Sequence, residues 1–225
     1  MSLIAASRHA ATQAERRNLI LDAAERCFVR TGFHRTTMQD VAVEAGMSAG
    51  NLYRYFPSKE AIVSGLSERD RDELAADFAR ISTAEDFLVA FEAMGRKHLI
   101  EDPREKAILV MEIWSEATRN PAISTQCGDF ECEARRHMRT VFGEAQRLGA
   151  IAPQIDVDMA ARMMLTYADG LFKRRALEPA FDGERELAIA LALFKAIFAG
   201  AVPALSPPAV AAAAPGSILI TEVQS

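Results

Sequence analysis

Hydrophobic side chains recur every three or four positions along almost the whole sequence, the spacing that places them on one face of an α-helix. Glycine and proline fall between these runs and not inside strand-like alternation. The pattern therefore predicts an all-α protein with nine helices. The expected helices cover 12–31, 38–45, 49–55 and 58–81, then stretches marked by 87–98, 107–114 and 127–148, one that ends near 177 and one over 183–198.

Three short segments near the N-terminus carry helix-start signals. Thr37 is followed three positions later by Asp40, the spacing of a capping box, while Ser48 and Ser58 stand where an N-cap accepts hydrogen bonds from unpaired amides. Gly46-Met47-Ser48 forms the turn between two short helices. We therefore predict a three-helix, helix-turn-helix head over residues 1–57, in which the second and third helices meet at a steep angle.

The remaining helices are expected to form a second domain over residues 58–200. Its first helix, 58–81, is predicted to be a connector that lies half in each domain. The segment 187–194 is apolar all round, which indicates burial on two sides, one against the core and one against a second copy of the chain. A homodimer through helices eight and nine follows. Residues 201–225 are rich in Ala and Pro and are expected to form a flexible tail without an assigned function.

Composition excludes several classes of protein. A chain of 225 residues that is 50% hydrophobic has enough apolar surface for a real core. No uninterrupted apolar run of about 18 residues is present to span a bilayer, and the N-terminus lacks an apolar signal segment, so a cytoplasmic protein is expected. The histidines and cysteines show no metal-ligand spacing, and no phosphate-binding loop or nucleophile motif occurs. We therefore predict no enzyme activity, no cofactor and no metal.

The net charge of −5 argues against a nucleic-acid partner only as long as it is taken as a whole. Residues 1–60 hold eight Lys and Arg against six Asp and Glu, whereas residues 61–225 hold 18 against 25. The acidic total thus conceals a mildly basic head. Because that charge is small, DNA binding is expected to need two heads together and to weaken with added salt.

Residues 36–63 read TTMQDVAVEAGMSAGNLYRYFPSKEAIV, which resembles the DNA-binding signature of the TetR family of bacterial transcriptional regulators. The order Thr-Thr, Val-Ala, Ala-Gly, Leu-Tyr, Tyr-Phe, Ser-Lys-Glu is far more specific than a generic helix-turn-helix pattern. Residues 109–123 and 168–171 resemble, more loosely, the regulatory domain of the choline-responsive, BetI-like branch. The resemblance implies a homodimeric regulator, a repressor that a small-molecule inducer of unknown identity releases from double-stranded operator DNA.

The predicted helix 49–55 is short enough to present its first turn to the edges of base pairs in a major groove. Gly50 lets backbone approach the duplex, Asn51 is suited to hydrogen-bond a base or phosphate, and the hydroxyls of Tyr53 and Tyr55 are within reach of phosphate oxygens. Leu52 and Phe56 are expected to face inward. By resemblance, the DNA-facing positions are Thr37, Ser48, Ala49, Gly50, Asn51, Tyr53, Tyr55 and Lys59. Met38 and Ala49 depart from the family by being apolar, so hydrogen-bond readout rests mainly on Asn51 and Gln39.

Helices five to eight offer apolar and aromatic side chains that could line a ligand pocket. The candidates are Phe91, Met94, His98, Met111, Trp114, Phe130, Met138, Met163 and Tyr167. Trp114, His98 and Tyr167 rank first because each adds a polar group to an apolar stripe. The same spacing is also typical of ordinary core residues, and His98 equally fits a hydrogen-bonded core histidine.

Three alternatives stay open from the sequence. The first is a thiol-based redox sensor on the same scaffold, which would use Cys127 or Cys132. The second is an enzyme with an apolar pocket, which the missing acid, base or nucleophile constellation argues against. The third is an activator in place of a repressor, which depends on the position of the operator relative to its promoter.

Overall fold

The computed structural model describes residues 2–82 and 86–201, with side chains placed for 13–81 and 86–201. Over these ranges the chain forms nine α-helices, one π-helical turn and no strand, which confirms the all-α prediction. No helix among them is both long and apolar enough to cross a bilayer. The predicted tail, apart from Ala201, lies outside the described residues. The helices are α1 (Ser2–Thr31), α2 (Met38–Glu44), α3 (Ala49–Tyr53), α4 (Lys59–Ser82), α5 (Phe87–Arg96), the π-helical turn η1 (Lys97–Glu101), α6 (Arg104–Ala117), α7 (Pro121–Arg147), α8 (Val157–Leu177) and α9 (Gly183–Phe198).

Two helices begin earlier than the hydrophobic pattern predicts. α1 starts at Ser2 and not near 12, since its first turns are rich in alanine, which favours helix without forming an apolar stripe. α7 starts at Pro121, where the Asn120 side chain accepts hydrogen bonds from the amides of Ala122 and Ile123 at 3.2 and 3.4 Å. Asn120-Pro121 therefore opens α7, because proline suits the first helical position, and α6 has already ended at Ala117.

The helix expected around 87–98 changes form before it ends. α5 stops at Arg96, and the next five residues, Lys97–Glu101, wind as a π-helix with Leu99 buried. Asp102 then turns into extended backbone, with φ −59° and ψ 143°. A single π turn within a helical region is rare and is often found at functional sites.

Two apolar cores lie at the two ends of α4. The head core joins α1, α2 and α3, with Phe28, Leu52 and Phe56 fully buried. It extends past residue 57, because Ile62, Val63 and Leu66 of α4, Leu109 of α6 and Ile123 of α7 belong to it. The larger core of the second domain is built around Phe91, Phe142, Phe194 and Phe198, whose rings pack mostly edge to face, and it includes Phe78 and Ile81 of α4.

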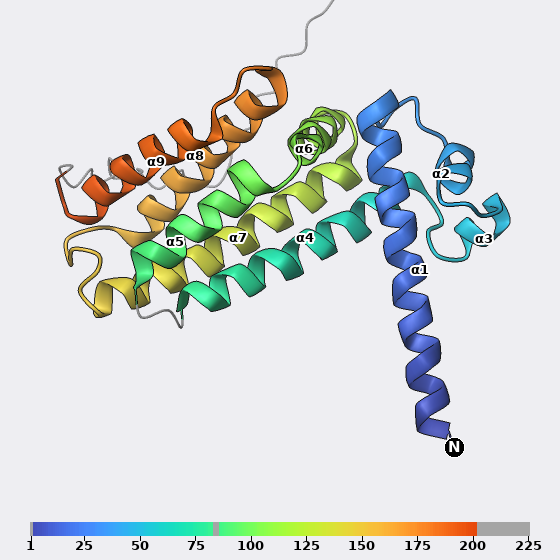
Figure 1. The fold of residues 1–225 in the computed structure, drawn as a ribbon, viewed down its shortest axis with the longest axis horizontal. Helices are drawn as coiled ribbons and strands as arrows, with labels where there is room; N and C mark the ends of the chain where they lie inside the picture. Colours follow the sequence, from blue (N-terminus) through green and yellow to red (C-terminus); the bar gives the residue numbers. More distant parts are fainter. Residues whose placement is uncertain (1, 83–85, 202–225) are drawn as a thin grey trace, which may run out of the picture.

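The helices of the second domain form an elongated body, with α4 and α7 side by side and α8 and α9 along another side (Figure 1). α1 crosses one end of this body, and its N-terminal half projects away from it. α2 and α3 lie on the outer side of α1, away from the body. The head is therefore attached at one end, through α1, α4 and α6.

Gly65 of α4 is where the connector passes closest to the head core. A Cβ atom at this position would lie 2.8 Å from Cε1 of Phe56 and 3.0 Å from Cδ2 of Leu21. We predict that Gly65→Ala lowers the free energy of unfolding by about 1–3 kcal/mol through overpacking. Gly143→Ala is the control, since its Cβ would meet nothing within 4 Å, and it is expected to be neutral or stabilising by up to about 1 kcal/mol. Urea denaturation of both variants measures this, and equal midpoints would contradict tight packing at Gly65.

Candidate nucleic-acid interface

The first helix of the helix-turn-helix pair is fixed by a capping box at Thr37. The Thr37 hydroxyl oxygen accepts a hydrogen bond from the Asp40 amide at 3.1 Å, and the Thr37 amide donates to Oδ2 of Asp40 at 2.8 Å. Hydrogen bonds from the Thr37 hydroxyl and amide lower the pKa of the Asp40 carboxyl. The predicted capping box is confirmed, and it sets where α2 begins.

The turn into α3 is made by a glycine with positive φ and a serine cap. Gly46 has φ 67°, a conformation that costs a residue with a side chain more than it costs glycine. The Ser48 hydroxyl oxygen then accepts from the Asn51 amide at 3.3 Å, as its predicted N-cap role requires. Leu52 is fully buried in the head core, which also contains Val41 and Ala42 of α2, so the opposite side of α3 faces outward.

The predicted DNA-facing residues differ in exposure. Thr37, Ser48, Gly50 and Tyr53 are exposed, Tyr53 with 52% of its surface accessible, and a Cβ on Gly50 would meet nothing within 4 Å. Asn51 is half-buried. Ala49 and Tyr55 pack partly against the head core. α3 lies beside α2 at the outer edge of the head, on the side away from the body (Figure 1).

Lys59 ties the start of α4 to the loop between α1 and α2. Its Nζ donates to the backbone oxygens of Phe33 and His34 at 2.8 and 3.2 Å, and it lies 4.5 Å from the centre of the Phe33 ring. Burial lowers the pKa of the Lys59 ammonium. An ammonium group has three donors, so these two carbonyls leave one donor for a phosphate. Lys59 thus has a structural role that its position in the motif does not reveal.

Sequence reasoning missed two arginines in the head. Arg54 is the C-cap of α3, lies between the two tyrosines and is exposed. Arg35 is also exposed. Its Nε donates to the Thr31 backbone oxygen at 2.9 Å, and this hydrogen bond does not use its two terminal nitrogens. The signal for Arg54 was available, because it stands between two predicted phosphate contacts. Arg26 and Arg30 add little to the charge facing DNA, since both bind Glu44, at 2.7 and 3.1 Å.

The nine predicted ligand residues do not gather in one place. Phe91 and Met138 lie in the core of the second domain, and Met94 and Tyr167 pack against it. His98 is held between two carboxylates, with Nε2 3.1 Å from Oδ2 of Asp77 and Nδ1 3.0 Å from Oδ2 of Asp102. The other four lie outside that core. They are Met111, Trp114 and Phe130, which are half-buried, and Met163, which is 39% exposed.

A helix-turn-helix head with an exposed, serine-capped third helix, joined to a helical body, defines a transcriptional regulator. Residues 20–66 match the family model of the bacterial regulatory proteins of the tetR family, and residues 92–199 match the C-terminal domain of BetI-type transcriptional repressors. The chain belongs to the TetR family and is a ligand-responsive, DNA-binding regulator.

Relatives and solved structures agree with this assignment. The regulator TtgR of Pseudomonas putida is 31% identical over 178 residues, which cover 73% of this chain and 82% of TtgR. The regulator UidR of Escherichia coli is 28% identical over 155 residues, 69% of this chain and 79% of UidR. SmeT, the repressor of the Stenotrophomonas maltophilia multidrug efflux pump SmeDEF, has a similar structure, with TM-score 0.67, 25% identity, and 81% and 89% of the two chains covered. TetR-family regulators bind operator DNA and small-molecule effectors and are typically dimeric.

Lys59 provides a test of the head's internal support. We predict that Lys59→Met destabilises the protein by about 1–3 kcal/mol even without DNA, because two backbone oxygens lose their donor. Lys173→Met, at an exposed lysine of α8, is the control and should have little effect. Thermal unfolding of both variants measures the difference. A Lys59→Met protein as stable as the control would show that the two hydrogen bonds do not support the loop.

Proposed function

We propose that the protein is a homodimeric repressor whose two α3 helices enter successive major grooves of one operator, with half-sites centred about 34 Å apart. The observation that carries the proposal is the exposed, Ser48-capped α3, held by the head core on its Leu52 side. An effector would change the separation of the two heads and so weaken operator binding. Such a regulator works on the chromosome, so we place it in the cytoplasm.

For the DNA contacts we keep the predicted set and rank it by exposure. Ser48, Gly50 and Tyr53 stand on the open face of α3, and Asn51 is the polar side chain best placed to read a base. Thr37 and Lys59 would contact phosphates at the starts of α2 and α4. Ala49 and Tyr55 would reach DNA with their outer edges only. Arg54 joins the set as a further phosphate contact.

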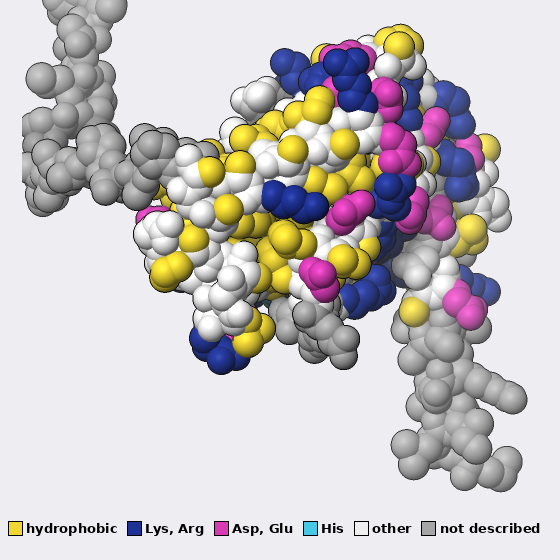
Figure 2. Space-filling model, turned by 60° about the vertical axis from the view of Figure 1, so that its left-hand side comes forward, with side chains coloured by type: hydrophobic (Ala, Val, Ile, Leu, Met, Phe, Trp, Pro, Cys, Tyr) yellow, Lys and Arg dark blue, Asp and Glu magenta, His cyan; other side chains and the backbone are white. Residues whose placement is uncertain are grey.

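A dimer through α8 and α9 is supported by the outward face of α9. Leu187, Leu191 and Phe194 point into the core, yet the opposite face also carries large apolar side chains, Ile189 and Leu193, which are 46% and 40% exposed. Hydrophobic side chains gather on the part of the surface away from α1, whereas charged ones concentrate toward α1 (Figure 2). Large apolar side chains grouped on one exposed face favour a protein–protein interface there.

For the effector we propose a site that borders α6. Met111 and Trp114 of α6 are half-buried outside the main core. Glu112, between them, accepts a hydrogen bond from the Phe33 amide of the head at 3.0 Å. Leu109 and Ile113 of the same helix pack in or against the head core. A ligand that displaces α6 would therefore act on the head directly.

The redox alternative gains no support. Burial raises the pKa of the Cys127 thiol, which is opposite to the activation that a sensor cysteine needs. Cys132 is exposed on α7, and no relative named above is described as a redox sensor. We therefore propose no thiol chemistry.

Operator selection from a random duplex library by the wild-type protein tests the proposed DNA contacts. We expect a palindromic operator, because a two-fold symmetric dimer reads two equal half-sites. Asn51→Ala should weaken operator binding by about 1–3 kcal/mol of binding free energy. It should also relax the sequence preference at one base pair, as loss of a base contact does. Tyr53→Phe should weaken binding to all sequences alike, as loss of a phosphate contact does. Fluorescence anisotropy measures both, with Val43→Ala on α2 as an exposed control. Full affinity in both variants would contradict the assignment of α3 as the reading helix.

The interface is tested by placing a charge on it. Leu193→Glu is expected to shift the protein toward monomer and to abolish binding of a palindromic operator, because a carboxylate would be buried between subunits. Val89→Glu is the control, since Val89 is also an exposed apolar residue, 63% accessible, but lies on α5. Light scattering after size exclusion measures the mass. A dimeric Leu193→Glu protein would place the interface elsewhere.

A further inference from the structure

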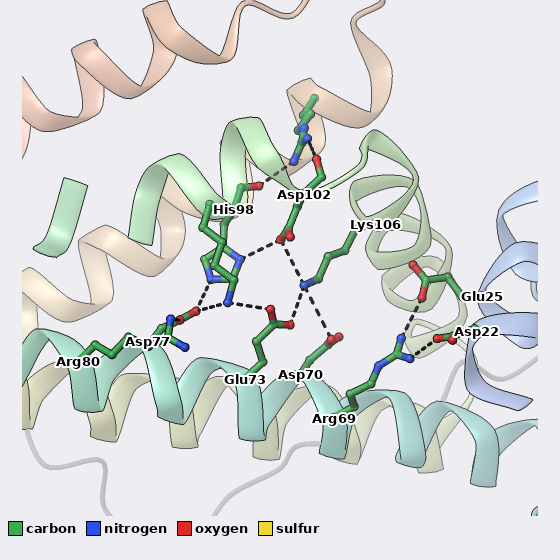
Figure 3. A network of polar contacts seen from close by, with 12 residues as sticks. Asp22, Glu25, Arg69, Asp70, Glu73, Asp77, Arg80, His98, Asp102 and Lys106 are labelled. Atoms are coloured by element: carbon green, nitrogen blue, oxygen red, sulfur yellow. Dashed lines mark hydrogen bonds and ion pairs between the residues drawn. The ribbon is translucent and has the colours of Figure 1, made fainter. Parts of the chain in front are cut away.

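α4 carries three carboxylates on one face, at Asp70, Glu73 and Asp77, and basic groups from η1 and α6 meet them (Figure 3). Lys97 lies 2.7 Å from Oε1 of Glu73 and 2.7 Å from Oδ2 of Asp77, whose side chain is 4% exposed. Lys106 lies 3.2 Å from Oε2 of Glu73 and 4.0 Å from Oδ1 of Asp70. We call these groups, with His98 and Asp102, the α4 charge cluster.

Asp102 closes the cluster at the end of the π-helical turn. Its Oδ2 lies 3.0 Å from Nδ1 of His98 and 3.2 Å from Nζ of Lys106. Burial alone would raise the pKa of the Asp102 carboxyl, but the hydrogen bond from His98 and the charge of Lys106 outweigh it and lower that pKa to about 2. Because these groups are partly buried, removing one leaves its partners uncompensated. The cluster therefore holds α4 against η1 and α6 in one arrangement.

Arg69 extends the contacts from α4 to the head. Its Nη1 donates to Oδ1 of Asp22 at 2.6 Å and its Nη2 donates to Oε2 of Glu25 at 2.9 Å, two carboxylates on adjacent turns of α1 (Figure 3). Arg69 and Asp70 are neighbours on α4, so one contacts the head while the other belongs to the α4 charge cluster. Two adjacent residues of α4 therefore contact the two sides: Arg69 binds α1, and Asp70 lies in the α4 charge cluster.

The other end of the cluster is fastened to α8. Arg175, which is 6% exposed, donates to the backbone oxygen of His98 at 2.7 Å and to that of Asp102. In return, Arg104 donates to the backbone oxygens of Arg175 and Ala176 at 3.1 and 2.5 Å. One backbone oxygen within η1, that of His98, and the one just after it, that of Asp102, thus accept hydrogen bonds from a side chain of α8.

We propose that Lys106 and Arg69 are positioning residues for operator binding, which act in series to carry displacements of η1 and α8 through α4 to the DNA-binding head. The proposal rests on the proposed function, in that a shift of the head changes how two α3 helices fit one operator. η1 is the element that would change, since a π turn that returns to α-helical hydrogen bonding rotates Lys97 and His98 relative to Asp77. Such coupling requires an element with two arrangements that both sites influence.

A double-mutant cycle on the full-length protein tests whether the two residues act in series. Lys106→Met and Arg69→Met are each expected to weaken binding to the selected operator about ten-fold, and the double variant is expected to be no weaker than either single one. Arg71→Met is the matched control, because Arg71 is two residues along α4 and faces Glu133 of α7 at 3.7 Å. Lys106→Arg, which keeps the charge, should retain wild-type affinity.

Independent effects would overturn the proposal. If the two residues stabilised separate parts of the protein, their factors would multiply to about a hundred-fold in the double variant. An unchanged affinity in Lys106→Met would overturn it as well. Thermal unfolding confirms that each variant is folded at the assay temperature.

Hydrogen exchange without DNA separates this proposal from the proposed function. Lys106→Met is expected to raise exchange of the backbone amides in 19–31 of α1, although the ion pairs of Lys106 go to Asp70, Glu73 and Asp102, none of which is on α1. Arg71→Met should not raise it. If the wild-type protein selects no operator, the proposed function fails and this comparison still decides the coupling. Unchanged exchange in α1 of the Lys106→Met protein would overturn the proposal.

Discussion

The architecture depends on α4 belonging to two cores at once. Ile62 and Leu66, near its start, are buried among the helices of the head, and Phe78 and Ile81, near its end, are buried in the core of the second domain. At 1.5 Å per residue, its 24 residues span about 36 Å. Because the helix is continuous between the two cores, a displacement of one end tilts the other. No loop intervenes that could absorb the motion.

The contacts along α4 are of two kinds, apolar contacts and ion pairs, and they have different effects on the structure. The apolar contacts supply most of the free energy of folding, but they are not directional. The ion pairs contribute less net stability and are specific in geometry. Arg69 with Asp22 and Glu25, and Lys106 with Glu73 and Asp102, therefore fix the angle of the helix more than they stabilise it. The ion pairs along α4 are therefore the contacts to mutate first when coupling between effector binding and DNA binding is measured.

Local sequence signals were enough to predict much of the head. The capping box at Thr37 and the caps at Ser48 and Ser58 are short-range features, and the structure confirms all three. Hydrophobic spacing likewise gave the nine helices, with α9 at its predicted bounds. The family signature predicted which side of α3 is exposed. Leu52 is the buried residue of this short helix, and the side opposite to it therefore faces outward.

Features that depend on contacts between residues far apart in the sequence could not be predicted from it. The two carbonyls that hold Lys59 come from residues 25 and 26 positions away, and the Glu112 contact to Phe33 spans 79 positions. The acidic face of α4 has the pattern of a solvated surface until η1 and α6 are placed against it. η1 itself has no composition that distinguishes it from an α-helix. The predicted ligand residues lie in several places because the spacing of apolar and aromatic residues along a helix is the same for a core as for a pocket.

We infer that α4 couples the DNA-binding head to the second domain. By linkage, a coupling of this kind works in both directions, so operator DNA must alter the second domain without any effector. Hydrogen exchange of the wild-type protein with and without its selected operator measures this directly. We expect changed protection of the backbone amides in 97–106, in addition to protection in α3. Changes confined to the head, residues 13–57, with 97–106 unaltered, would contradict it.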